Sequence, residues 1–342
     1  MHNVAAFTEG KNVPSARYRV EQYIDILALN NINLVNFPSR YGKYPPSKKS
    51  KRPYWFLAEI FSRLSSIFKG NLYFDSILLQ RELISQFSFL EKLINKPIIF
   101  DFDDSIFLGK NKKNIESIVL RSDKVICGNS YLAEWASSFS KNVFIIPTGI
   151  DTKHLFNPLR KIKKFFDNDK IIIGWIGTSS NLNNFLLIES ALQNLINDFP
   201  ELRIAIMSDI KPSFKLIPDN RIIFMEWSPL AEISFLNSID IGIMPLFDNE
   251  WTRGKCSFKA IQYMSMQKPV VLSNVGMNKE LIKHNCNGLL AKNTDEWTDQ
   301  LRYLINYPTA RKTLGSAGRE TICNDYDVEI IGEKIANVIK SI

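Results

Sequence analysis

The chain has 342 residues, of which 45% are hydrophobic and 23% charged, and its formal net charge is +8. This length suits two domains of ordinary size, and the composition excludes a disordered or fibrous protein. No apolar run reaches the roughly 20 residues that a membrane span needs, and the first residues lack the long apolar core of a secretory signal. The positive charge indicates a negatively charged partner, such as nucleic acid, anionic lipid or nucleotide phosphates.

The basic clusters and the cysteines indicate which partners and which cellular compartment to expect. Basic residues gather at 47–52, 110–113 and 160–164, and such loops are most often solvated surface. No zinc-binding spacing or RNA-binding aromatic motif accompanies them, so nucleic acid ranks low as a partner. Scattered cysteines without a Cys-x-x-Cys pair predict reduced thiols in a cytoplasmic protein. The four cysteines are Cys127, Cys256, Cys286 and Cys323.

The first half of the chain predicts alternating strands and helices. A helix is expected over residues 15–31, where apolar side chains recur at helical spacing. Residues 122–140 predict a strand and then a helix, with Asn129 and Ser130 at its cap. Apolar runs predict further strands over residues 3–9, 32–38, 75–82, 96–107 and 142–151.

Residues 51–70 form an aromatic, basic and amphipathic segment. Trp55, Phe56, Phe61 and Phe68 recur along it. Such a helix can lie in a membrane interface, or it can pack on its own domain. Periodicity alone does not separate these two alternatives.

The second half predicts a new alternation after a candidate linker at residues 157–170. Two such halves predict two Rossmann-like domains with parallel sheets and right-handed crossovers. Ligands of such sheets bind beyond the carboxyl ends of the strands. The expected strands lie at 170–177, 202–209, 221–227, 240–246 and 268–274, and the expected helices at 183–200, 257–266 and 278–285.

The first motif is the glycine turn at the end of the strand 170–177. Gly177 would let the backbone come close to a phosphate, and Thr178 and Ser179 add hydroxyl groups beside free amides at the start of a helix. The alternative is an ordinary glycine turn with a Ser or Asn cap.

The second motif is the charged loop at residues 248–259, between a buried strand and a helix. Lys255 and Lys259 are four residues apart, so they share a face if both are helical, and Arg253 lies just ahead of them. A helix start already favours anions, and added cations predict a site for phosphate. Solvated lysines are the alternative.

The third motif follows the expected strand at 96–107, where Asp101, Asp103 and Asp104 are crowded together. In a strand, Asp101 and Asp103 point to the same side. Such carboxylates can bind a metal, act as a base or cap the next helix, and we favour a hydrogen bond to a substrate hydroxyl over metal binding.

The remaining polar residues do not match other common active sites. The histidines His2, His154 and His284 are isolated along the chain. The sequence has no serine-hydrolase elbow and no Walker loop.

Several stretches resemble the retaining GT-B glycosyltransferases of the group commonly called family 4. A Pro-x-Gly-x-Asp segment resembles the end of the family's N-terminal domain, and Pro-Val-Val and Asn-Gly-Leu-Leu segments resemble its nucleotide-sugar domain. The similar stretches are residues 143–158, 238–246, 258–282, 285–293 and 310–339.

The resemblance implies an α/β protein of GT-B fold, in which two Rossmann-like domains face a central cleft. The implied acceptor-binding domain covers residues 1–157, and the nucleotide-sugar-binding domain covers 158–325. Residues 326–342 are expected to form a C-terminal helix that packs back toward the N-terminal domain.

The donor side departs from the family pattern at its glutamates. The family usually carries two glutamates eight residues apart, of which the second binds the donor ribose. Gly254 and Gln262 stand at these two places here. We therefore expect Gln262 at the ribose and Glu250 in the role of the first glutamate. Trp227 is expected against the base, with a buried core tryptophan as the alternative.

The phosphate site departs as well. The family usually has an arginine and a lysine after the first strand of the second domain, where this chain has Gly-Thr-Ser-Ser-Asn at 177–181. We expect Lys255 and Lys259 to supply that charge, with Gly177, Thr178 and Ser179 lending amides and hydroxyl groups.

The acceptor side is implied by three segments of the first half. Many family members place a histidine where this chain has Asp103, so Asp103 is expected to position the acceptor hydroxyl. Residues 9–19 stand in place of a glycine-rich loop, and Gly10 and Arg17 are candidates there, together with Asp104.

The implied activity is transfer of a sugar from a nucleotide-diphosphate sugar to a hydroxyl of a glycan or lipid-linked glycan, in cell-surface polysaccharide synthesis and without a metal or other cofactor. The expected location is the cytoplasm and the inner face of the cell membrane, with peripheral contact to anionic lipid. Two alternatives stay open: a protein that binds a nucleotide sugar without turnover, and an epimerase of GT-B type.

Overall fold

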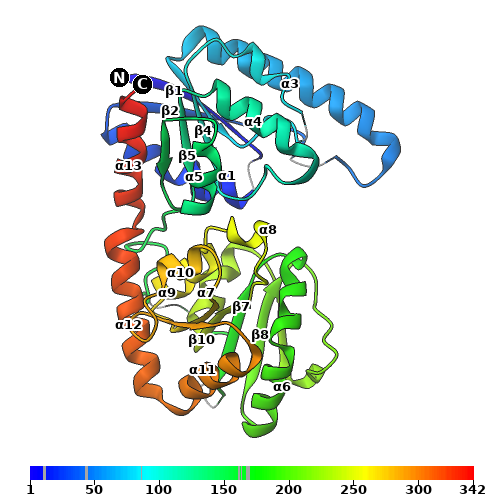
Figure 1. The fold of residues 1–342 in the computed structure, drawn as a ribbon, viewed down its shortest axis with the longest axis vertical. Coiled ribbons are helices and arrows are strands. Elements are labelled where there is room, and N and C mark those ends of the chain that lie inside the picture. Colours follow the sequence, from blue (N-terminus) through cyan, green and yellow to red (C-terminus); the bar gives the residue numbers. More distant parts are fainter. Residues whose placement is uncertain (11–12, 43–44, 86, 161, 163, 167–169) are drawn as a thin grey trace. The chain divides into compact units, whose positions relative to one another are not determined.

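The computed structural model describes residues 1–10, 13–42, 45–85, 87–160, 162, 164–166 and 170–342. The chain divides into two compact units, each built on its own sheet (Figure 1). The first unit comprises Met1–Gly149, Gly254–Cys256 and Val328–Ile342, and the second comprises Ile150–Arg253 and Ser257–Asp327. Residues 161, 163 and 167–169 of the expected linker lie outside the described residues.

The first unit contains a parallel sheet whose strand order is β2-β1-β3-β4-β5-β6. All residues of β3 and β4 are buried, as expected of a parallel sheet covered on both faces. In this order β1 and β3 are neighbours, and the chain changes direction across the sheet between them. The strands are β1 (His2–Thr8), β2 (Ile32–Pro38), β3 (Ser76–Gln80), β4 (Ile98–Phe102), β5 (Lys124–Cys127) and β6 (Val143–Ile145).

In the first unit, the expected cap of one helix is confirmed, and the expected extent of another helix is wrong. Asn129 caps α5, since its side chain accepts a hydrogen bond of 2.9 Å from the amide of Leu132. The single helix expected over 15–31 is wrong, because the backbone leaves the helical path at Val20, with φ −131°. The helices are α1 (Pro14–Arg19), η1 (Glu21–Tyr23), α2 (Ile24–Leu29), η2 (Lys49–Lys51), α3 (Arg52–Tyr73), η3 (Glu91–Leu93), η4 (Gly109–Asn111), α4 (Lys112–Arg121), α5 (Ser130–Ser137) and α13 (Val328–Lys340).

The last helix of the chain belongs to the core of the first unit. Ile331, Ile335 and Ile339 of α13 are buried together with Leu27 of α2. Gly332 allows this close approach, because a Cβ atom there would lie 2.7 Å from Ile26 Cγ2. The first unit is therefore completed by residues far from it in sequence.

The second unit contains a parallel sheet with the order β12-β11-β10-β7-β8-β9. If β7 is taken as the first strand, this is the Rossmann order 3-2-1-4-5-6 read from the other edge. The chain first adds strands on one side of β7 and then on the other side, so the order reverses between the neighbours β7 and β10. Both predicted sheets are confirmed as parallel. The strands are β7 (Ile172–Ile176), β8 (Arg203–Ser208), β9 (Ile222–Glu226), β10 (Ile241–Met244), β11 (Val270–Ser273) and β12 (Leu289–Ala291).

Helices cover this second sheet, and its core is mainly aliphatic with a few large aromatic side chains. Trp175 of β7 and Trp297 of α11 are fully buried in one apolar cluster, and the Trp175 ring lies 5.3 Å from that of Phe185. The helices are η5 (Ser179–Leu187), α6 (Glu189–Asp198), η6 (Asp219–Arg221), α7 (Pro229–Ser238), α8 (Glu250–Arg253), α9 (Phe258–Ser265), α10 (Met277–Leu281), α11 (Thr294–Asn306) and α12 (Pro308–Asp325).

Two further observations concern the described part of the chain. None of its helices combines the length and apolar character needed to cross a membrane. All four cysteines are free thiols.

Gly174, at the centre of β7, gives a test of the packing of the second unit. A Cβ atom at this position would lie 2.3 Å from Ile239 Cγ2, so Gly174→Ala forces Ile239 to shift. We expect a loss of about 1–3 kcal/mol in the free energy of unfolding, measured by denaturant titration. The double variant Gly174→Ala/Ile239→Ala should lose less than the sum of the two single variants, because the smaller side chain makes room. Additive losses would contradict this packing.

Candidate functional site

The point where the second sheet changes direction carries a glycine and a lysine in close contact. Gly177 follows β7 directly, and its amide donates a hydrogen bond of 3.0 Å to the carbonyl of Met207. A Cβ atom on Gly177 would lie 2.5 Å from Lys259 Cε and 2.9 Å from the Trp175 ring. Because glycine has no side chain, Lys259 can reach the carboxyl end of the central strand.

Lys259 stands in the first turn of α9 and is held over an aromatic ring. Its Nζ atom lies 5.3 Å from the centroid of the Trp175 ring, which is a cation–π distance. The helix is fixed beneath it by Tyr263, whose hydroxyl accepts a hydrogen bond of 3.0 Å from the amide of Ile176. The positive end of the α9 dipole and the Lys259 ammonium are thus placed together at the end of β7.

Lys255 does not share a helix face with Lys259. Helix α9 begins at Phe258, and Ser257 before it has the left-handed φ of 51°. The Ser257 hydroxyl donates to Asn278 Oδ1 at 2.7 Å, which anchors this turn. Lys255 belongs to Gly254–Cys256, which groups with the first unit. The condition for a shared face is therefore not met.

The turn after Gly177 opens a 3-10 helix, η5, and its first residue is already hydrogen-bonded. The amide and hydroxyl of Ser179 donate to the two carboxylate oxygens of Asp209 at 2.6 and 2.8 Å. Burial raises the pKa of Asp209, but these bonds outweigh it and lower the pKa below its ordinary value. The Thr178 and Ser180 hydroxyl groups are 2.9 Å apart. A ligand that uses the Ser179 amide has to displace Asp209.

The other residues expected on the donor side, Gln262, Trp227 and Glu250, differ in how far they are exposed to solvent. Gln262 is 3% exposed, and its Nε2 atom donates to Glu232 Oε1 at 2.9 Å. Trp227 is half-buried just after β9, and Glu250 is exposed at the start of α8. Glu232 on α7 was missed by the sequence analysis, because only the fold brings it to Gln262.

The first sheet carries a charged cluster where the chain changes direction between β1 and β3. Arg81 follows β3 and has the left-handed φ of 62°. Its Nη2 atom lies 2.6 Å from Asp103 Oδ1 and 2.7 Å from Asp104 Oδ2, and its Nη1 atom lies 3.7 Å from Glu9 Oε2. Burial by itself lowers the pKa of Arg81, but the three carboxylates raise it well above its ordinary value. The guanidinium group therefore stays charged and fixes all three.

Asp101 and Asp103 do not act as a pair. Strand β4 ends at Phe102, and the Asp101 carboxylate binds the buried Arg19, with 3.1 Å between Arg19 Nε and Asp101 Oδ2. Arg19 also donates to the carbonyl of Ile146 at 2.8 Å. Asp101 is thus part of the core, and Asp103 is the carboxylate of the cluster around Arg81.

The other acceptor-side candidates lie in the same unit. Gly10 is buried directly after Glu9, with φ 152°. Arg17 is half-buried, and its guanidinium carbon lies 5.0 Å from the centroid of the Tyr18 ring. Lys255 Nζ lies 3.4 Å from Asp104 Oδ1. The sequence indicated Asp103 and Asp104 but not Arg81 and Glu9, which fall within the expected strands 75–82 and 3–9 and directly follow the observed strands β3 and β1.

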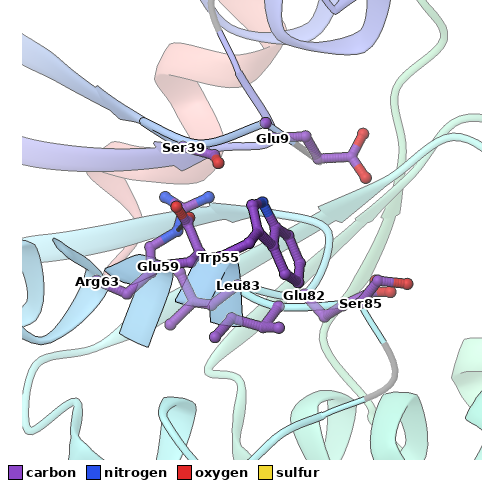
Figure 2. Close-up of a pocket in the computed structure, with 10 residues that line it drawn as sticks. Glu9, Ser39, Trp55, Glu59, Arg63, Glu82, Leu83 and Ser85 are labelled. Carbon is purple, nitrogen blue, oxygen red and sulfur yellow. Dashed lines mark ion pairs between the residues drawn. The ribbon is translucent and has the colours of Figure 1, made fainter. Parts of the chain in front are cut away.

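A small pocket lies beside this cluster, with room for about one water molecule. Figure 2 shows Trp55 between the Glu59–Arg63 pair and the carboxylates of Glu9 and Glu82. Glu59 Oε1 and Arg63 Nε are 2.8 Å apart and both side chains are buried. Within the described residues, no group of three or more His, Cys, Asp or Glu side chains is placed to hold a metal ion.

The second unit matches a known family model. Residues 170–307 match the model described as glycosyl transferases group 1. An uncharacterized glycosyltransferase of Methanocaldococcus jannaschii is 26% identical over 219 residues, which are 58% of this chain and 54% of that protein. The match therefore spans about half the length of this curated relative.

Solved structures match the whole chain at low identity. The Anabaena HepE structure in complex with UDP and glucose is 14% identical, with a TM-score of 0.73 and 100% of both chains covered. Sucrose-phosphate synthase from Thermosynechococcus elongatus is also 14% identical, with a TM-score of 0.74 over 100% of this chain and 99% of that one. With the two six-stranded sheets, these likenesses confirm the predicted α/β GT-B fold with two Rossmann-like domains. Together with the family model, they support a glycosyltransferase.

Arg81 gives the first test of the site. Replacing it with methionine leaves the half-buried carboxylates of Asp103 and Asp104 without their cation, so we expect a loss of about 3–5 kcal/mol in the free energy of unfolding. Arg253 is the matched control, because it makes an equally short pair with Asp248 at 2.6 Å but both side chains are 48% exposed. Arg253→Met should cost about 1 kcal/mol or less. Equal losses in the two variants, measured by denaturant titration, would contradict the cluster.

Glu91 gives a test by pH. Burial raises the pKa of its carboxyl group from 4.5 to about 7, although Oε1 accepts a hydrogen bond of 2.8 Å from the amide of Leu83. Folding therefore takes up a proton between these pH values, and the stability that the neutral carboxyl contributes is lost as the pH rises from about 4.5 to 7. Glu91→Gln removes this loss, so the variant should gain about 3 kcal/mol on the wild type across the window. Parallel stability curves would show that Glu91 titrates normally.

Proposed function

We propose that this protein is a retaining glycosyltransferase of the hexosyltransferase type, which moves a sugar from a nucleotide-diphosphate sugar to a hydroxyl of a glycan or lipid-linked glycan in cell-surface polysaccharide synthesis. The observation that carries the proposal is Lys259, placed over Trp175 at the point where the second sheet changes direction. Ligands of open α/β sheets bind at this point.

The chemistry that Lys259 would perform is stabilisation of the leaving group. Breaking the bond between the sugar and the diphosphate leaves negative charge on the diphosphate, and a fixed cation lowers the energy of that charge. The amides of the first turn of α9 would add to this, because a helix start favours anions, and the absence of a side chain on Gly177 lets Lys259 reach the end of β7. We propose Lys255 as a second cation for the diphosphate, so the reaction needs no metal.

The donor's nucleoside is assigned to three residues. Trp227 would lie against the base, Gln262 would contact the ribose, and Glu250 would take the role of the family's first glutamate on the donor side. Gln262 is held by Glu232, which fixes the direction of its amide group. Structural neighbours were solved in complex with UDP and with UDP-glucose, which makes a UDP-sugar the first donor to test.

The acceptor hydroxyl is assigned to Asp103. Arg81 donates to Asp103 at 2.6 Å and thereby fixes the direction of its carboxylate. Gly10, Arg17 and Asp104 would complete the acceptor side. A lipid-linked acceptor would bring the protein to the cytoplasmic face of an anionic membrane, and nucleic acid is not a partner in this proposal.

Nucleotide binding tests the donor site. A nucleoside diphosphate that binds the folded chain should raise its melting temperature, and UDP is compared with GDP, ADP, TDP and CMP. Lys259→Ala should weaken the binding about ten- to a hundredfold, since a charge-assisted contact is lost. Lys215→Ala, at an exposed lysine of the same unit, is the control and should bind like the wild type. No shift with any nucleotide would overturn the proposal.

Turnover tests the reaction itself. With donor and acceptor present, product should form with the anomeric configuration of the donor, as read by NMR, and chelation of metals should not reduce the rate. Asp103→Asn should lower kcat about a hundredfold or more if its carboxylate positions the hydroxyl. Binding without turnover would indicate a pseudoenzyme, and conversion of the donor without acceptor would indicate an epimerase.

A further inference from the structure

Helix α3 exposes a set of large apolar side chains, although other apolar residues of the helix, such as Ile67, are buried. Its exposed side chains include Tyr54 (74% exposed), Leu57 (56%), Phe61 (69%), Phe68 (68%) and Leu72 (56%). We call these five side chains the outer stripe. A surface helix of a globular protein normally turns its apolar side to the core and its polar side to water.

The outer stripe is continuous along one side of the helix. Its members are separated by three, four or seven residues, which places them above one another on one face. From Tyr54 to Leu72 the stripe runs for about 27 Å at 1.5 Å per residue. Exposed apolar patches of this extent mark interaction sites. Figure 1 shows α3 at the border of the first unit.

The opposite face of α3 is buried and includes the charged residues Glu59 and Arg63, which lock the helix in this orientation. Arg63 pairs with Glu59 at 2.8 Å and donates to the carbonyls of Thr8 at 2.8 Å and Phe37 at 3.1 Å. Turning the stripe inward would leave these buried charges and carbonyls without their partners, which is costly.

Gly70 adds a steric lock on the same face. A Cβ atom at this position would lie 2.9 Å from Ile77 Cδ1 and 3.2 Å from the Phe7 ring. The helix can lie this close to the sheet only with Gly70 facing inward. The outward position of the stripe is thus a property of the packed unit.

The charges around the stripe are positive. Four exposed basic side chains precede the stripe, and Lys69 lies between Phe68 and Leu72; the four are Lys48, Lys49, Lys51 and Arg52. The acidic residue of the helix, Glu59, is 2% exposed and is neutralised by Arg63. A second copy of the chain would present the same stripe and the same cations, so like charges would meet at a two-fold contact. An anionic surface complements both the stripe and the charges.

We propose that the outer stripe and the basic residues beside it dock α3 in the plane of an anionic lipid surface. Apolar side chains would enter the boundary between headgroups and acyl chains, and the lysines would stay among the anionic headgroups. The proposal rests on the proposed function in one respect, which is that a lipid-linked acceptor would be found at such a surface. Lipid binding itself is measured without donor or acceptor.

The test is co-sedimentation of the full chain with phosphatidylcholine vesicles that do or do not contain phosphatidylglycerol, at low and high salt. The wild type should bind the anionic vesicles, and high salt should weaken the binding. Phe61→Ser/Phe68→Ser should bind at least about tenfold more weakly. Leu29→Ser/Leu230→Ser removes two side chains that are 86% and 93% exposed outside the stripe, and it should bind like the wild type.

Three outcomes would overturn the proposal. The first is that the wild type fails to bind anionic vesicles at low salt, and the second is that the phenylalanine variant binds them as well as the control variant. The third is that the wild type forms a dimer without lipid, whereas the phenylalanine variant is a monomer. The last result would assign the stripe to a second copy. The melting-temperature shift with nucleotide is measured on the same variants. A normal shift without lipid binding would contradict only the docking surface, and lipid binding without any shift would contradict only the transferase.

Discussion

The order of strands in two parallel sheets determines where this chain can bind a ligand. In each sheet the chain changes direction once, between β1 and β3 in the first and between β7 and β10 in the second. The connections on the two sides of such a point run apart, so the carboxyl ends of the two strands are left uncovered. In the second sheet Gly177 keeps this end free of a side chain, and Lys259 fills the space with a cation.

The two units place opposite charges at these points. The second offers an ammonium group and the first amides of α9, which suit a leaving diphosphate. The first offers the three carboxylates of Glu9, Asp103 and Asp104, which outnumber the two cations beside them, Arg81 and Lys255. Carboxylates accept hydrogen bonds from sugar hydroxyl groups and repel phosphate. This division of charge fits a protein that keeps donor phosphate and acceptor hydroxyl at separate sites.

The sequence predicted the strands β1 to β11 and the cap at Asn129, because these depend on neighbouring residues, but it did not predict the short strand β12 (Leu289–Ala291). Apolar runs and a capping side chain act over a few positions, and the alternation of strands and helices was enough to predict two parallel sheets. Contacts between distant residues were not predictable in this way: Gln262 with Glu232, and Arg81 with Asp103, depend on which strands and helices become neighbours. The left-handed turn at Ser257 separates Lys255 from α9, and no local pattern signals it. The 51–70 segment was expected to be amphipathic, but only the packed structure shows that Phe61 and Phe68 are exposed while Ile67 is buried.

The most direct measurement of the central claim is the contribution of Lys259 to binding of the terminal phosphate. Calorimetry would give the affinities of a nucleoside diphosphate and of the matching monophosphate for the wild type, Lys259→Ala and Lys215→Ala. The account predicts that the wild type prefers the diphosphate, and that Lys259→Ala loses about tenfold or more of this preference while Lys215→Ala keeps it. An unchanged preference in Lys259→Ala would contradict the assignment of this lysine to the leaving diphosphate.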